Sequence, residues 1–209
     1  MSNRREFLVA AAAAVPAVVV APSILASASF DPRPRDGARE VLTALVDERY
    51  RESRLFGQHF RSARKTVRTT PRGDLTQVWL GYLRPVWARE PLAIAGLTPQ
   101  AALFCLEQLA TSHALRVVFH GEHIVHPGGW TEHSLLRGAE AAHVTARDLE
   151  RAGSRWPGSV ARALADYSLG SVAVPRVPSD AALDPPLPPG ARLLTSWVIA
   201  APWAPTQGA

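Results

Sequence analysis

The chain has 209 residues, of which 47% are hydrophobic and 20% are charged, and its formal net charge at pH 7 is +5. This balance excludes wholesale disorder, because enough apolar surface is present to build a core. The only cysteine is Cys105, so a disulfide within the chain is also excluded. We expect this lone thiol to be buried in the core.

The first 28 residues have the organisation of an export signal. The segment NRREFL at residues 3–8 precedes a run rich in Ala and Val, and Ala26-Ser27-Ala28 offers a cleavage site. The run is too short and too weakly apolar for a membrane span, which needs about 20 apolar residues. The paired arginines Arg4 and Arg5 resemble the twin-arginine (Tat) signal, which implies export of an already folded protein by the Tat translocase.

This resemblance assigns Arg4, Arg5, Ala26 and Ala28 to the signal peptide, residues 1–28. Residues 29–209 are then a single mature globular domain, long enough for one core and too short to argue for two. The expected location is the periplasm or the exterior, with a soluble mature protein. The alternative is a signal that is retained as an N-terminal anchor.

A long amphipathic helix is predicted from Gly37 to about Val67, because apolar side chains recur there at helical spacing. Residues 51–72 hold seven basic residues against one acid. Polar and mostly basic residues recur there every three or four positions, at Arg51, Arg54, Gln58, Arg61, Lys65, Arg68 and Arg72. The stripe suits a protein partner or an anionic membrane surface, and an exported location argues against nucleic acid. The alternative is a solvated arginine face. The docking residues on this stripe are Arg51, Arg54, Arg61, Lys65 and Arg68.

The next segment predicts a β-α-β-β unit. It consists of a strand at 92–97, a helix at 99–113 and strands at 115–119 and 124–126. Gly121-Glu122 fits a two-residue type II′ turn that joins the last two strands as a hairpin. The unit is similar in pattern to small α+β modules at the entrance of secretins and outer-membrane receptors, a likeness that carries no function.

Further elements complete an α+β prediction. Six prolines between residues 175 and 190 predict an extended, polyproline-like linker. The fold class is therefore a single α+β domain with a long N-terminal amphipathic helix, a central β-α-β-β unit, further helices, and a C-terminal strand after the Pro-rich linker. The remaining predicted elements are a helix opened by the capping box of Asp74 and Gln77, a strand at 130–136, helices at 139–152 and 157–167, and the last strand at 193–201.

Histidines gather around the predicted hairpin, where five of the seven lie between residues 113 and 133. In that hairpin His120 and His123 flank the turn as an opposed cross-strand pair, with Cβ atoms roughly 5 Å apart, so both can reach one metal ion. A third ligand would come from Glu132, His133 or Glu122. Such a set leaves one position open and suits zinc.

A strand that runs straight through residues 120–126 predicts a different arrangement. His120, Glu122 and His126 would then share one face, and His123 would point to the other. A third interpretation is that these histidines are exposed polar side chains at a turn, with no ligand.

Functional motifs in the sequence are few. No nucleophile elbow, phosphate loop, dinucleotide fingerprint or haem-attachment motif occurs. We therefore expect an exported, non-catalytic accessory or binding protein of the cell envelope. The alternative is a small metal-dependent enzyme, such as a hydrolase, that uses the His-rich hairpin.

Overall fold

The computed structural model describes residues 41–167, 169 and 186–202. The predicted export signal lies outside the described residues, as does the predicted linker up to residue 185. All described residues belong to one compact unit, Pro34–Ala209. In this described part, no helix is long and apolar enough to cross a membrane.

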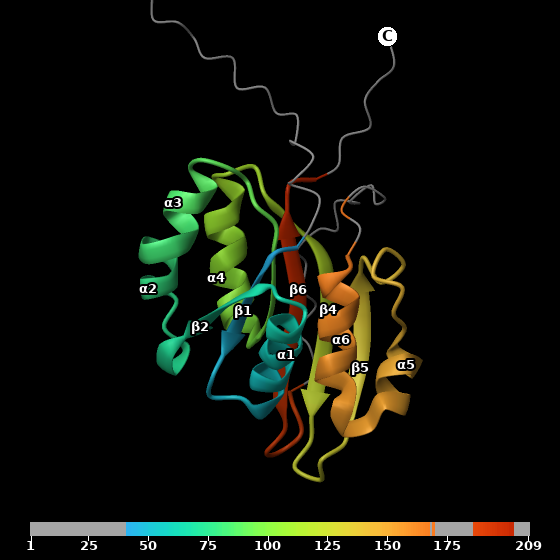
Figure 1. The fold of residues 1–209 in the computed structure, drawn as a ribbon. Coiled ribbons are helices and arrows are strands. Elements are labelled where there is room, and N and C mark those ends of the chain that lie inside the picture. The colour runs from blue at the N-terminus through green and yellow to red at the C-terminus, as the bar shows by residue number, and fades with distance from the viewer. Residues whose placement is uncertain (1–40, 168, 170–185, 203–209) are drawn as a thin grey trace, which may run out of the picture. The chain divides into compact units, whose positions relative to one another are not determined.

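A mixed β-sheet with the strand order β2-β1-β3-β6-β4-β5 forms the centre of the fold (Figure 1). β1 runs parallel to both β2 and β3, whereas β6 is antiparallel to β3 and β4, and β5 is antiparallel to β4. The predicted mixture of helices and strands is thus confirmed. The strands are β1 (Thr43–Asp47), β2 (Thr66–Thr70), β3 (Ile94–Thr98), β4 (Arg116–Val125), β5 (Thr131–Arg137) and β6 (Arg192–Ala200).

Helices cover both faces of this sheet (Figure 1). The helices are α1 (Arg51–Ser62), α2 (Thr76–Val78), α3 (Arg84–Trp87), α4 (Gln100–Thr111), α5 (Ala146–Ala152) and α6 (Trp156–Ala165), with short 3-10 or π turns at Pro71–Gly73, Trp79–Leu83 and Gly153–Arg155. One hydrophobic cluster joins the sheet to α1, α5 and α6, and a second joins it to the segment from α2 to α4.

Successive strand residues enter the two clusters alternately, as the period of two in a strand requires. Val46 and Val198 belong to the α1/α5/α6 side, and their neighbours Leu45 and Trp197 to the other. Gly96 makes this packing possible, because a Cβ there would overlap the fully buried Trp197 ring. Both faces of the sheet are therefore filled at its centre.

The single long helix predicted up to Val67 is wrong in the described residues. β1, α1 and β2 occupy that stretch instead, and residues 37–40 lie outside the described part. Every residue of β1 is buried, so this strand lacks the alternation that identifies a half-exposed strand. Its apolar side chains matched helical spacing by coincidence.

Two local features separate β1 from α1 and α1 from β2. After β1, the Asp47 carboxylate holds the Arg49 guanidinium at 2.7 Å, and the Asp47 N–H donates to Ser53 Oγ at 2.9 Å. After α1, Arg64 takes a left-handed conformation with φ 59°, which ends the helix. The sequence Thr-Val-Arg-Thr-Thr of β2 is rich in β-branched residues, which favour strands.

The strand-helix-strand part of the predicted β-α-β-β unit is confirmed by β3, α4 and β4, but the predicted hairpin is wrong, because the strands predicted at 115–119 and 124–126 are one strand, β4. The strand predicted separately at 130–136 is β5. β4 continues through Gly121-Glu122, and the chain turns at residues 126–130, where the His126 N–H donates to the Trp130 carbonyl at 3.0 Å. Gly121 serves close packing instead, since a Cβ there would lie 2.8 Å from Leu135 and 2.9 Å from Ser196 Oγ.

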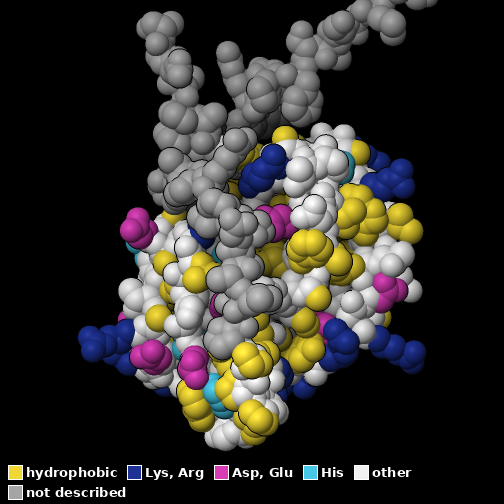
Figure 2. All heavy atoms as spheres, turned by 180° about the vertical axis from the view of Figure 1, so that it is seen from behind, with side chains coloured by type: hydrophobic (Ala, Val, Ile, Leu, Met, Phe, Trp, Pro, Cys, Tyr) yellow, Lys and Arg dark blue, Asp and Glu magenta, His cyan; other side chains and the backbone are white. Residues whose placement is uncertain are grey.

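The outer surface of α4 and of the turn before α3 carries apolar side chains. Phe104 is 62% exposed and Leu80 is 55% exposed. Cys105 is exposed as well, so its predicted burial is wrong, because its side chain leaves α4 on the side away from the sheet. Figure 2 views the molecule from behind and shows hydrophobic side chains in patches, with Lys and Arg side chains scattered at its edges.

Candidate functional site

The structure separates the histidines that the sequence analysis grouped as metal ligands. Because β4 runs straight through, His123 points to the α1/α5/α6 face, where it is fully buried. His120 leaves the strand on the other side, since three residues along a strand reverse the face. The pairing of His120 with His123 across a hairpin is therefore wrong.

His123 instead meets His133, its directly opposed neighbour on β5. The two Nδ1 atoms lie 2.8 Å apart, and His123 Nε2 lies 2.7 Å from Ser196 Oγ of β6. Gly121, two residues before His123, leaves the space in which this contact with Ser196 forms. Three strands thus contribute to one buried hydrogen-bonded chain.

Trp156, at the start of α6, covers both imidazoles. Its ring centroid is 4.3 Å from that of His123 at an angle of 33°, and 5.1 Å from that of His133 in an edge-on arrangement. Trp156 is itself buried. Trp156 therefore contributes to the burial of the two histidines, which are called the histidine pair below.

The histidine pair is neutral at neutral pH. Burial lowers the pKa of His123 well below its usual value, and the nearby His133 and His120 lower it further. Burial lowers the pKa of His133 to about 4. One neutral imidazole then donates its Nδ1–H to the Nδ1 of the other, and Ser196 donates to or accepts from His123 Nε2.

The remaining predicted metal ligands lie elsewhere. Glu132 Oε1 accepts from His126 Nε2 at 2.8 Å, and the His126 ring stacks on Trp130 with centroids 3.6 Å apart. Among the described residues, no three His, Cys, Asp or Glu side chains come together as a metal-binding group. The predicted zinc ligand set of His120, His123, Glu132 and His133 is not assembled.

The predicted basic stripe is dispersed over three elements, because α1 ends at Ser62. Lys65 Nζ donates to the Val41 carbonyl at 2.9 Å and to the Ala165 carbonyl, so it holds the chain together. Arg68 lies on β2, where its guanidinium sits 4.2 Å from the centroid of the Tyr82 ring. Arg54 donates to the Glu48 carbonyl, and Arg61 is exposed.

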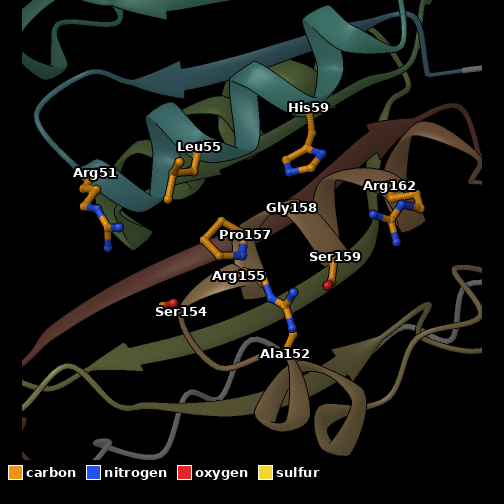
Figure 3. Close-up of a pocket in the computed structure, with 10 residues that line it drawn as sticks. All are labelled: Arg51, Leu55, His59, Ala152, Ser154, Arg155, Pro157, Gly158, Ser159 and Arg162. Atoms are coloured by element: carbon orange, nitrogen blue, oxygen red, sulfur yellow. The ribbon is translucent and has the colours of Figure 1, made fainter.

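Arg51 contributes to a different feature, a cavity of about 460 Å³ between α1 and the beginning of α6 (Figure 3). This volume lies within the range of small-molecule sites, about 300–1,000 Å³. The cavity is lined by Arg51, Leu55, His59, Ala152, Ser154, Arg155, Pro157, Gly158, Ser159 and Arg162, and is called the cationic pocket below.

One wall of the cationic pocket comes from α1 and the other from α6 and the turn before it. Figure 3 shows His59 pointing from α1 toward Gly158 of α6. A Cβ at Gly158 would overlap the His59 ring, so glycine is what allows the two helices to approach here. A smaller cavity of about 210 Å³ adjoins the pocket, shares His59 and Arg162, and has Asp166 in its wall.

Most of the residues that line the cationic pocket are not among the predicted site residues. Arg155 and Arg162 lie about a hundred positions after Arg51, and only the packing of α6 on α1 brings them together. The available signal was the repeat of small and basic residues in Gly153–Arg162, where Gly158 marks a close helix approach. Comparison with known proteins adds nothing to this assignment, since no family model, curated protein or solved structure matches the chain significantly.

Proposed function

We propose that the protein is an exported, non-catalytic binding protein that holds a small oxyanion, of the phosphate or sulfate type, in the cationic pocket. The observation that carries this proposal is the lining of the pocket. Three arginines and one histidine surround a cavity of about 460 Å³, and the lining includes no acidic residue among those described.

The surroundings of these arginines support the proposal, because no acid among the described residues pairs with them. Arg51, Arg155 and Arg162 take part in none of the ion pairs between described residues, although several acids of this part of the chain are paired. A guanidinium presents several N–H donors in a planar fork that matches the oxygens of phosphate, sulfate or carboxylate. Ser154 and Ser159 add hydroxyl donors at the same wall.

The apolar part of the lining indicates the size of the ligand. Leu55, Ala152 and Pro157 offer a small apolar wall beside the charged groups. A small oxyanion with a short apolar substituent therefore fits this pocket better than the charged backbone of a polymer such as a nucleic acid. We propose a free soluble anion as the ligand. A membrane lipid headgroup or an acidic partner protein is the alternative source of the anionic group.

Binding of sulfate to the purified protein is the direct test. Sulfate stays a dianion from weakly acidic to alkaline pH, so its charge does not change with the conditions. At about pH 7.5 and constant ionic strength, we expect saturable binding by calorimetry. Arg155→Ser should weaken it by about tenfold or more, because a hydrogen bond to a charged group contributes about 1.5–3 kcal/mol.

Arg61→Ser is the matched control, since Arg61 is exposed on α1 outside the pocket lining. It removes the same charge and should change sulfate affinity less than about twofold. Equal weakening by both variants would mean that net charge alone attracts the anion. Vesicles of anionic phospholipid form a second arm, and tight vesicle binding that survives Arg155→Ser would favour the membrane surface.

Export through the Tat route is the second part of the proposal and rests on the sequence of residues 1–28. We expect that replacing both Arg4 and Arg5 by lysine leaves an uncleaved precursor in the cytoplasm, because the twin-arginine motif identifies the substrate to the translocase. Cell fractionation and N-terminal sequencing measure the outcome. Normal export and processing of the variant would assign the protein to the general secretory route.

A further inference from the structure

The histidine pair and the cationic pocket share one short segment of chain. Trp156 contacts the rings of His123 and His133, while the residues on either side of it, Arg155 and Pro157, line the pocket. A displacement of the Trp156 ring must therefore move a wall of the pocket. The first residues of α6 and the residue before them therefore contact the histidine pair on one side and line the pocket on the other.

The histidine pair accepts one proton without losing its geometry. A protonated His123 donates through Nδ1 to a neutral His133 and through Nε2 to Ser196, so both hydrogen bonds survive. A second proton places an N–H on both Nδ1 atoms, which lie 2.8 Å apart. Two donors and two positive charges then face each other, and the rings must separate.

Separation of the rings acts on Trp156. The ring is fully packed against His123, and interiors are close-packed, so an imidazole cannot move without displacing its neighbour. A charged imidazole also draws water into a site that Trp156 keeps dry. Both effects favour a state in which the start of α6 is displaced from the sheet.

Other charged groups around the histidine pair do not offset its protonation. On the α5 surface, Asp148 and Arg151 pair with each other and are exposed, and on β6 Arg192 pairs with Glu52 of α1. The other titratable groups on the elements packed around the pair are Arg116, His120 and Glu122 on β4, Glu132 and Arg137 on β5, Arg147 and Glu150 on α5, Arg155 and Arg162 at α6, and Arg51, Arg54, His59 and Arg61 on α1. Of these, His120 acts on His123 and disfavours its charged form.

We infer that protonation of the His123–His133 pair releases the anion held in the cationic pocket, with Trp156 as the connection between them. This inference rests on the proposed function and adds regulation to the same site. An exported protein experiences the pH of its surroundings directly, so a ligand captured at neutral pH would be released in acid.

Sulfate affinity measured as a function of pH tests this coupling. From about pH 7.5 to about pH 4.5, we expect the affinity of the unmodified protein to fall about tenfold or more, as is typical of coupling between sites. The closed pair resists protons over this range, whereas the imidazoles of the displaced state take them up near the ordinary histidine value of about 6.5, so acid favours the displaced state. The direction is diagnostic, because direct protonation of His59 in the pocket wall would instead strengthen anion binding in acid. His59→Gln should therefore retain the loss.

His133→Gln removes one titrating group and keeps an amide within reach of His123 Nδ1. We expect its sulfate affinity to change less than about threefold over the same pH range. A second measurement needs no variant. Because coupling is reciprocal, saturating sulfate should lower the pH at which the two imidazoles titrate in NMR spectra. Their affinity for protons should fall by the same factor as the affinity for sulfate falls in acid.

The outcomes separate the two proposals. Absence of saturable sulfate binding at about pH 7.5 would refute the pocket's function, and the regulation with it. Saturable binding overturns the regulation alone if affinity is constant or rises in acid, or if His133→Gln keeps the full pH dependence. The regulation is likewise overturned if sulfate leaves the imidazole titration of the unmodified protein unchanged.

Discussion

Trp156→Ala is expected to destabilise the protein by about 3–5 kcal/mol, the usual cost of truncating a large buried aromatic side chain. Trp156 is 2% exposed and contacts both imidazoles of the histidine pair. Its removal leaves a cavity and also exposes two polar rings whose hydrogen bonds depend on a dry surrounding. This loss is a large part of the 5–15 kcal/mol that stabilises a typical domain.

Urea unfolding gives the free-energy change, and Trp130→Ala is the matched control. Trp130 also stacks on a histidine, His126, but is 53% exposed, so its truncation should cost less than about 1 kcal/mol. A cost for Trp156→Ala that is no larger than that of Trp130→Ala would mean that α6 does not depend on this side chain.

The elements with clear local signals were predicted well. Thr98-Pro99 marked the border between β3 and α4, and the β-branched run after Leu115 marked β4. The last strand was predicted within a residue or two of β6. In each case, local sequence preference and the final packing agree, and this is where single-sequence reasoning works best.

The errors share a physical cause, which is packing between distant segments. β1 is buried on both faces, and position 121 has room only for glycine because Leu135 and Ser196 lie close to it. Neither constraint can be seen in the local sequence. Pro127-Gly128-Gly129 is a strong turn signal in the sequence, because glycine and proline favour turns. A turn centred on Gly128 pairs His123 with His133, so the histidine pair was within reach of the sequence.

The cationic pocket, in contrast, could not be predicted from the local sequence. Its walls come from α1 and α6, whose packing against each other depends on Gly158 and on the sheet face that both helices cover. Of the residues that line the pocket, the predicted basic stripe includes only Arg51, and the end of α1 at Ser62 interrupts that stripe. Periodicity finds a charged face on one helix, but it does not find a site shared by two.

Stability is expected to fall as the pH drops below about 6.5, the ordinary value for histidine. In the folded protein, burial holds the pKa of His133 at about 4 and that of His123 well below its usual value. Between about pH 6.5 and these lowered pKa values, the two histidines bind protons in the unfolded chain but not in the folded chain, so acid favours unfolding. Above about pH 6.5, the histidines are neutral in both states and make no such contribution.

The expected loss from about pH 7 to about pH 5 is about 3 kcal/mol, a figure that allows for some solvent contact at His133. Urea unfolding at a series of pH values measures it. His133→Gln should reduce the pH dependence by about half, since one of the two refused protons is removed. His143→Asn is the control, because His143 is exposed and Asn tolerates its positive φ of 49°. It should keep the full dependence of the unmodified protein. If His133→Gln does so too, the acid sensitivity belongs to other groups, and the histidine pair is not where the folded protein excludes protons.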